Sequence, residues 1–130
     1  MRLAIALLLC FGAAACSSLG VSSKPPPVYV VFFEGPSIAL TDTAKHIVDH
    51  AAAEAKASDA LVQIAGQGAK SKGYNPKMAQ PRMQVVEDAL IADGIAADHL
   101  VRAELTTGDA KVDASGAQRV EIRLMAKPAT

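Results

Sequence analysis

The sequence is poor in the residue types on which several protein classes depend. Its 130 residues include two Cys and no Trp, and aromatic residues make up only 4%. So few Cys exclude a disulfide-stapled mini-protein and a Cys-rich zinc module, and so few aromatic rings exclude a stacking platform for single-stranded nucleic acid. The 13 basic residues are balanced by 13 acidic ones, so the chain lacks the positive charge that nucleic-acid binding requires. No nucleic-acid partner is expected.

The rest of the composition is that of a globular protein. Hydrophobic residues make up 51% and charged residues 20%. This mixture is too apolar for a disordered chain and too charged for a protein that crosses a membrane several times. The length predicts one folded domain, or two at most.

The amino-terminal segment has the organisation of a signal peptide. Arg2 supplies a positive charge, and the apolar run Leu3–Phe11 follows it. That run is much shorter than the roughly 20 residues that a membrane-spanning helix needs. Small residues then lead from Gly12 to Ala15, as a cleavage region requires. We therefore predict a signal peptide over residues 1–15.

Cys16 follows these small residues directly, and the arrangement resembles the lipobox of bacterial lipoproteins, with Ala13 where that motif most often has Leu. The resemblance implies that Cys16 becomes the first residue of the mature chain and carries acyl chains, which hold a protein on a membrane. Ser17, in place of the Asp that favours inner-membrane retention, implies an outer-membrane anchor that faces the periplasm. The alternative is ordinary secretion, with cleavage near Ala15 and an unmodified Cys16.

A tether links Cys16 to the folded part. Residues 16–27 are rich in Ser and end in Pro25–Pro27, which form a stiff, extended linker. The folded domain is expected over residues 28–130.

The first half of that domain contains two predicted strands around one helix. Val28–Phe33 is a continuous run of β-branched and aromatic residues, which predicts a strand buried on both faces. Thr41 is a good N-cap for a helix that runs to about Ala57. Leu61–Ala65 predicts a second buried strand, and a Gly- and Lys-rich loop follows over Gly66–Gly73.

The second half is predicted as a helix followed by two strands. We expect Pro81 and Arg82 in the first turn of the helix, where the missing N–H of Pro is harmless, and Gly94 at its end. Leu100–Leu105 and Arg119–Met125 alternate between apolar and polar residues, which is typical of strands covered on one face. The strand residues expected to point inward are Val101, Ala103, Leu105, Val120, Ile122 and Leu124. The helical residues expected to face the sheet are Ala44, Ile47, Val48, Ala51, Ala55, Met83, Val86, Ala89 and Leu90.

The element order strand, helix, strand, helix, strand, strand predicts an α/β fold of the α+β type. One sheet with both helices on one face makes a two-layer sandwich that buries all of these apolar stripes.

A series of residues follows the pattern of a known family. They are Phe33, Ser37, Leu40, Thr41, Gly66, Tyr74, Asn75, Met78, Arg82, Val86, Gly94, Ile95, Ala97, Asp98 and Arg119–Ile122. Together they make the stretch from Val28 to Met125 resemble the OmpA-like carboxy-terminal domain, a periplasmic module that binds peptidoglycan. The resemblance implies a two-layer α/β sandwich with a mixed sheet, and a non-enzymatic domain that binds peptidoglycan without a covalent bond.

In that family the ligand is the diaminopimelate of the peptidoglycan stem peptide. An Asp holds the ligand's amine, and the Arg that falls at Arg82 holds its carboxylate; Asn75 also matches the family pattern. This chain has Ala69 at the position of the Asp and Pro36 at that of a loop Asn. The resemblance therefore implies a ligand site at Arg82 and Asn75 with weaker binding or an altered choice of ligand.

The residues themselves leave two interpretations of Arg82 open. A guanidinium beside exposed helix amides forms a site for a carboxylate or a phosphate, and the loop after a buried strand is a common place for a crevice. Alternatively, Arg82 pairs with Glu34 or Glu87 and binds nothing.

Other candidate sites are weaker. His46, His50 and Glu54 lie four residues apart on the first predicted helix, a spacing that can hold a metal. No HExxH pattern accompanies them, so a solvated helix face is the better interpretation, and neither a metal nor a cofactor is expected. No nucleophile is paired with a His at a motif spacing, so an enzyme is not expected.

Two functions stay open. The first is a lipoprotein whose partners are the membrane and the peptidoglycan stem peptide. The second is a docking or assembly component of a cell-envelope complex that has lost peptidoglycan binding and contacts other envelope proteins. Arg82 and Asn75 favour the first, and Ala69 and Pro36 favour the second. We take peptidoglycan binding as the expectation.

The variant Cys16→Ser tests the anchor. Without the thiol there is nothing to acylate, so we expect an unprocessed protein or a soluble exported one. Intact-mass measurement of the membrane fraction checks this, because the parent chain should carry the mass of the acyl chains. A mature parent chain without that mass would contradict the lipoprotein prediction.

Overall fold

The computed structural model describes residues 24–67, 75–105 and 118–128. The signal peptide and Cys16 lie outside this part, as does Ala69, so the predictions about them stay predictions. Within the described ranges no helix combines the length and the apolar character needed to cross a membrane. The elements are β1 (Val28–Phe32), α1 (Asp42–Ser58), β2 (Leu61–Gln67), α2 (Pro76–Ala92), the 3-10 helix η1 (Ala97–His99), β3 (Leu100–Leu105) and β4 (Arg119–Met125).

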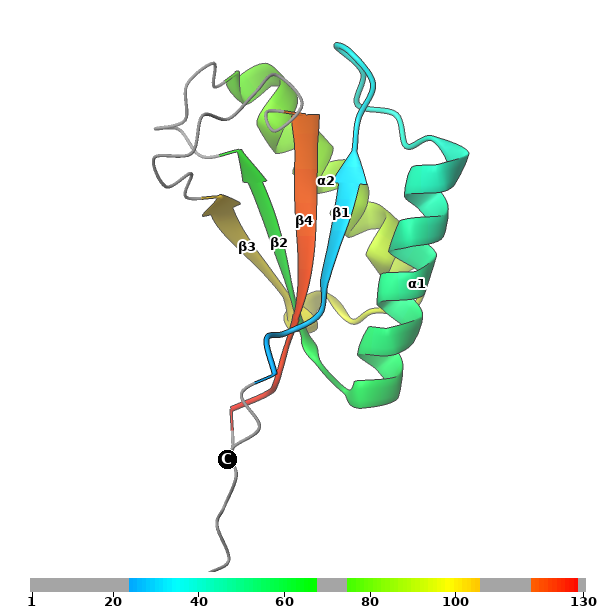
Figure 1. Ribbon diagram of the computed structural model, residues 1–130, viewed down its shortest axis with the longest axis vertical. Coiled ribbons are helices and arrows are strands. Elements are labelled where there is room, and N and C mark those ends of the chain that lie inside the picture. The colour runs from blue at the N-terminus through cyan, green and yellow to red at the C-terminus, as the bar shows by residue number, and fades with distance from the viewer. Residues whose placement is uncertain (1–23, 68–74, 106–117, 129–130) are drawn as a thin grey trace, which may run out of the picture.

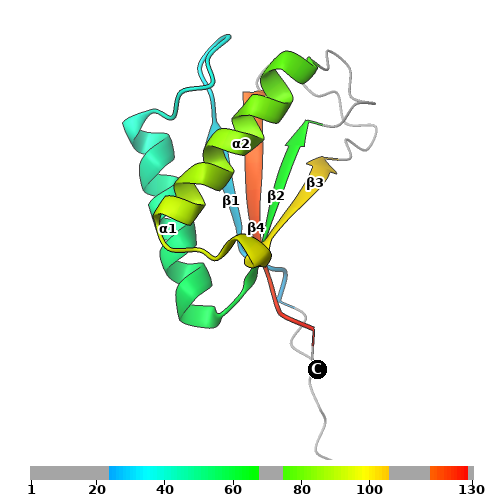
Figure 2. The ribbon, with the colours of Figure 1, turned by 180° about the vertical axis from the view of Figure 1, so that it is seen from behind.

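These strands form one mixed sheet with the order β1-β4-β2-β3. β4 lies between β1 and β2 and is antiparallel to both, whereas β2 and β3 are parallel. Figure 1 shows the sheet in front of α2, with α1 beside β1, and Figure 2, seen from behind, shows α2 across the sheet with α1 next to it. The predicted two-layer sandwich, its mixed sheet and its element order are confirmed.

The core lies between the helices and the covered face of the sheet. In β4 the inward residues Val120, Ile122 and Leu124 are all buried, and the residues between them are half-buried, so the predicted alternation is confirmed. Of the nine residues in the predicted helical stripes, seven are buried, and Ile47 and Ala89 are half-buried. The apolar residues that the helices bury are Ala44, Val48, Ala51, Ala52, Ala55, Ala79, Met83, Val86 and Leu90.

Helix α2 packs directly on the backbone of β2 at one point. A Cβ added to Gly66 would lie 2.7 Å from both Cγ and Sδ of Met83, closer than real side chains approach. The absence of a side chain at Gly66 therefore leaves room for the Met83 side chain to lie directly on β2.

The prediction that the first strand is buried on both faces is wrong. Val31 is fully buried, but Phe32 is 54% exposed and Val28 is 47% exposed. β1 is an edge strand of a sheet whose helices cover one face, so alternate side chains of β1 lie on the uncovered face.

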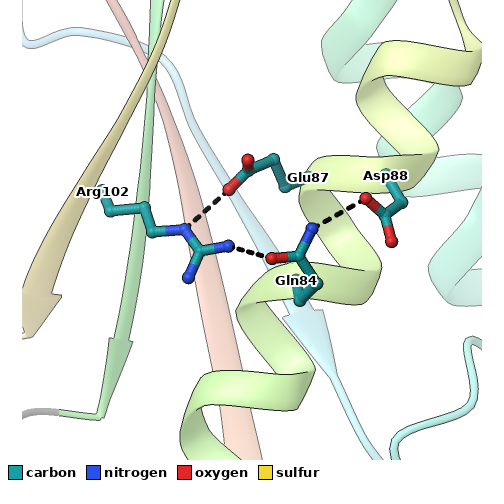
Figure 3. A network of polar contacts seen from close by, with 4 residues as sticks. All are labelled: Gln84, Glu87, Asp88 and Arg102. Atoms are coloured by element: carbon teal, nitrogen blue, oxygen red, sulfur yellow. Dashed lines mark hydrogen bonds and ion pairs between the residues drawn. The ribbon is translucent and has the colours of Figure 1, made fainter. Parts of the chain in front are cut away.

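The inward face predicted for the third strand is also wrong, although Leu105 on that face is buried. Val101 is 42% exposed, whereas Arg102 lies on the helix side of the sheet. There Arg102 Nε forms an ion pair with Glu87 Oε2 at 2.7 Å and its guanidinium also contacts Gln84 (Figure 3). β3 is the edge strand that lies beyond α2, and it carries a polar residue on that side.

The start predicted for the second helix is wrong by five residues. Asn75 caps α2 and Pro76 is its first residue, so Pro81 lies inside the helix and Arg82 in the second turn. Either proline could occupy the first turn, because the N–H that proline lacks has no partner there. The helix begins at Pro76 because Asn75, directly before it, provides the N-cap. The end is as predicted: Gly94 has φ of 97° and closes the helix.

Gly66→Ala is expected to destabilise the fold by about 1–3 kcal/mol, because the new methyl group overpacks against Met83. Urea denaturation measures the change. In a Met83→Ala background the same substitution should cost clearly less, since the colliding atoms are gone. An equal cost in both backgrounds would show that a clash with Met83 is not the cause of the destabilisation.

Candidate functional site

A cleft of about 330 Å³ opens where β1 and β2 end and β4 begins, at the upper end of the sheet in Figure 1. This volume is at the small end of the roughly 300–1,000 Å³ typical of ligand pockets. The N-terminal half of α2 and the loop between β1 and α1 both contribute to its walls. The lining residues are Gly35, Pro36, Gln67, Asn75, Met78, Arg82 and Gln118.

Among the described lining residues Arg82 is the charged one, and it is only 5% exposed. Its Nε donates to the carbonyl of Ser37 at 3.0 Å and its Nη2 to the carbonyl of Gly35 at 2.7 Å. The guanidinium carbon lies 5.2 Å from the centroid of the Phe33 ring, within the range of a cation–π interaction. The side chain is thus held in one orientation by a ring and two carbonyls.

The loop between β1 and α1 is shaped to present these carbonyls. Gly35 has φ of 49°, in the left-handed region that glycine adopts without strain. The amide of Ser37 donates to the carbonyl of Glu34 at 3.1 Å, which closes the turn. The turn brings the carbonyls of Gly35 and Ser37 to the same guanidinium.

Burial lowers the pKa of Arg82 from its ordinary value, but an arginine stays charged at neutral pH. The alternative that Arg82 pairs with Glu34 or Glu87 is wrong, because its bonds go to backbone carbonyls and Glu87 pairs with Arg102. In the described part of the chain no carboxylate forms an ion pair with Arg82. A buried cation therefore lies in the cleft, and the partners it has among the described residues are neutral.

Asn75 reaches the cleft from the start of α2. Its Oδ1 accepts a hydrogen bond from the amide of Lys77 at 3.0 Å, which satisfies one of the unpaired donors of the first turn. The structure therefore places both sequence-predicted ligand residues, Asn75 and Arg82, in the same lining, and their role in binding stays a prediction. Pro36 lies there too.

The sequence did not identify Gln67 and Gln118 as residues of this site, and it marked Phe33 only as part of the family pattern. Gln67 and Gln118 line the cleft from β2 and from the residue before β4, and Phe33 supports Arg82. Gln67 is 8% exposed and makes a polar interaction. Gln67 could have been found from the sequence, because it is a polar residue directly after an apolar strand. No comparable signal marks Gln118.

The other candidate group lies on α1. His46 and His50 are exposed, and Glu54 accepts a hydrogen bond from the hydroxyl of Tyr29, which raises the pKa of that tyrosine. Over residues 24–67, 75–105 and 118–128, no cluster of three or more His, Cys, Asp or Glu is arranged to hold a metal.

No protein-family model and no curated protein sequence matches the chain. Solved structures do. The OmpA-like domain of FopA1 from Francisella tularensis superposes with a TM-score of 0.59 at 20% identity, over 78% of this chain and 75% of that one. This chain has the OmpA-like fold.

Two further structures share the OmpA-like fold with it. The cell wall anchor of the T6SS from Pseudomonas aeruginosa matches with a TM-score of 0.58 at 21% identity, over 77% of this chain and 81% of that one. The peptidoglycan-associated lipoprotein from Burkholderia pseudomallei matches with a TM-score of 0.54 at 21% identity, over 75% of this chain and 88% of that one.

The described lining of this cleft offers one cation, carboxamides and apolar atoms. A guanidinium in a partly enclosed cleft suits a planar anion such as a carboxylate.

The cap at Asn75 gives a test of how α2 begins. Asn75→Ala should lower the free energy of unfolding by about 0.5–2 kcal/mol, because the amide of Lys77 loses its acceptor. Asn75→Asp should leave it nearly unchanged, since Asp caps as well as Asn. Urea denaturation of both variants checks this, and equal losses would show that the side chain does not cap α2.

Proposed function

We propose that this protein is a non-enzymatic lipoprotein that is anchored in the outer membrane through Cys16 and binds peptidoglycan in the periplasm without a covalent bond. Arg82 and Asn75 of the cleft are its proposed ligand residues. One observation carries the proposal: Arg82 is only 5% exposed at the cleft, and its described partners are neutral.

Electrostatics explains why that observation points to an anionic ligand. A buried charge is costly unless an opposite charge or several hydrogen bonds compensate it. The carbonyls of Gly35 and Ser37 use two N–H groups of Arg82, and a guanidinium has five. A carboxylate of the stem peptide would add charge-assisted bonds to the others, and these are stronger than bonds between neutral groups.

The wider setting supports the same function. The fold is shared with proteins described as a cell wall anchor and as a peptidoglycan-associated lipoprotein. The amino-terminal sequence resembles a lipoprotein leader with Cys16 as the acylated residue, and Ser17 favours the outer membrane. A chain anchored there by residues 16–27 would hold its domain in the periplasm.

Binding is expected to be weak. Ala69 replaces the family's Asp, and the missing charge-assisted bond is worth roughly 1.5–3 kcal/mol. That amounts to a loss of about ten- to a hundredfold in affinity.

A second candidate is a docking component of an envelope complex. The observation that favours it is the uncovered sheet face, where Phe32, Val28 and Val101 are 54%, 47% and 42% exposed. Ala69 and Pro36 favour it too, because they remove family ligand positions.

Sedimentation of the mature chain with purified sacculi, in mild detergent and at fixed salt, tests the proposal. Arg82→Ala should reduce binding at least about tenfold, because the ligand carboxylate loses its cation. Ala69→Asp should strengthen binding, because the new carboxylate restores a partner for the ligand's amine.

Arg102→Ala is the matched control. It removes the same charge, but Arg102 pairs with Glu87 on the far side of α2 and does not line the cleft (Figure 3). Its binding should equal that of the parent. No sacculus binding by the parent, with none gained in Ala69→Asp, would favour the docking component.

A further inference from the structure

β3 is an edge strand of the described sheet, and its outer edge has the backbone geometry that a further strand requires. β2 pairs with β3 in continuous register over the whole length of β3, so no bulge interrupts the strand. The strand also contains neither Pro nor Lys. Bulges, Pro and Lys are the usual devices that keep a sheet edge from pairing with another chain.

Two opposite charges lie on the same face of β3. Arg102 is in register with Ile64 of the core and Glu104 with Gly66 under Met83, so both charged side chains lie on the helix side of the sheet. Both are exposed. Charges can themselves protect a sheet edge. An Arg and a Glu two residues apart, however, match a second copy of the same strand that runs in the opposite direction.

We propose that a second copy of this chain pairs with the edge of β3, antiparallel, about a two-fold axis at Ala103. In that register Arg102 of each copy lies opposite Glu104 of the other, and Val101, which is 42% exposed, lies opposite Leu105. Opposite charges directly across an antiparallel pair stabilise it. An axis moved by one residue, to Arg102 or to Glu104, would instead place like charges opposite each other.

The helix layer leaves room for this arrangement. α2 packs on β2 and β4, so the two copies of α2 would be separated by about three strand spacings, or roughly 14 Å. Packed helices need only about 8–10 Å. A groove of about 310 Å³ lies beside β3, and its lining includes Gln80 and Met83 of α2 together with Arg102 and Glu104. The side chains that a second strand adds on this face therefore have space.

Arg102 can contact its own chain and the second copy together. Its Nε and Nη2 bind Glu87 and Gln84 (Figure 3), and a guanidinium has five N–H donors. The Glu104 carboxylate of the second copy would accept from the donors that remain. Glu87 and Gln84 would meanwhile hold the guanidinium in place.

The dimer is expected to be weak. A five-residue strand pair is small beside a standard interface of roughly 1,200–2,000 Å², so it should form at high local concentration and dissociate on dilution. None of the described residues that line the cleft belongs to β3, so each copy keeps its cleft. In a dilute sacculus assay the chain is a single copy, and Arg102→Ala remains a control for the cleft alone.

Disulfide trapping tests the register. Cα atoms directly opposite in an antiparallel pair are about 4.5–5.5 Å apart, which suits a disulfide. The mature Ala103→Cys chain, in excess detergent with a mild oxidant, should therefore form covalent dimers. Val101→Cys is the matched control on the same strand and face, because its two copies would be about 13 Å apart. The parent shows the background from Cys16. Equal trapping of both variants, or none above the parent in Ala103→Cys, would overturn the proposal.

Charge reversal tests the pairing of Arg102 with Glu104. In the Ala103→Cys chain, Glu104→Arg would put like charges opposite each other twice and should slow trapping about three- to tenfold. Adding Arg102→Glu restores two opposite pairs, so trapping should recover. Far-UV circular dichroism checks that each variant keeps its fold. No effect of Glu104→Arg, or a loss that Arg102→Glu does not recover in folded protein, would contradict the proposed pairing.

Discussion

Met83 packs against the backbone of Gly66 at a distance that leaves no room for a Cβ. Arg82 precedes Met83 on α2, and its guanidinium lies against the Phe33 ring and the loop between β1 and α1. A larger residue at position 66 would collide with the Met83 side chain and disturb the packing of α2 on β2. The orientation of Arg82 in the cleft therefore depends on how α2 packs on the sheet.

Much of the fold could be predicted because periodicity reports which residues share a face. The alternation in Arg119–Met125 and the stripe of α1 identified buried residues correctly. In β3 the alternating set was also correct, but the covered face was the opposite one. Periodicity cannot tell which face of a strand the helices cover. The exposure of β3 and β1 depends on β3 lying beyond α2 and on β1 lying at the edge of the sheet.

The candidate site could be predicted only in part. Asn75 and Arg82 came from the family resemblance, and the structure brings them to one cleft. The partners of Arg82 could not be foreseen, because they are backbone carbonyls presented by a turn around Gly35. Gln118 reaches the cleft from a distant part of the chain, and only the pairing of β4 with β1 brings it there.

A comparison of the arginines explains why Arg82 suits a ligand. Arg102 pairs with Glu87, and Arg119 and Arg123 share Glu121. Their side chains are 32–41% exposed, and salt and water weaken such surface pairs.

Arg82 differs in both respects, because it is buried and its described hydrogen bonds are to carbonyls. Carbonyls orient a guanidinium without cancelling its charge. A carboxylate of the chain at that place would have to be displaced by any anionic ligand, whereas the carbonyls of Gly35 and Ser37 can stay bonded while the ligand binds. The arrangement keeps the cation oriented and its charge available, and burial limits how far salt can screen it.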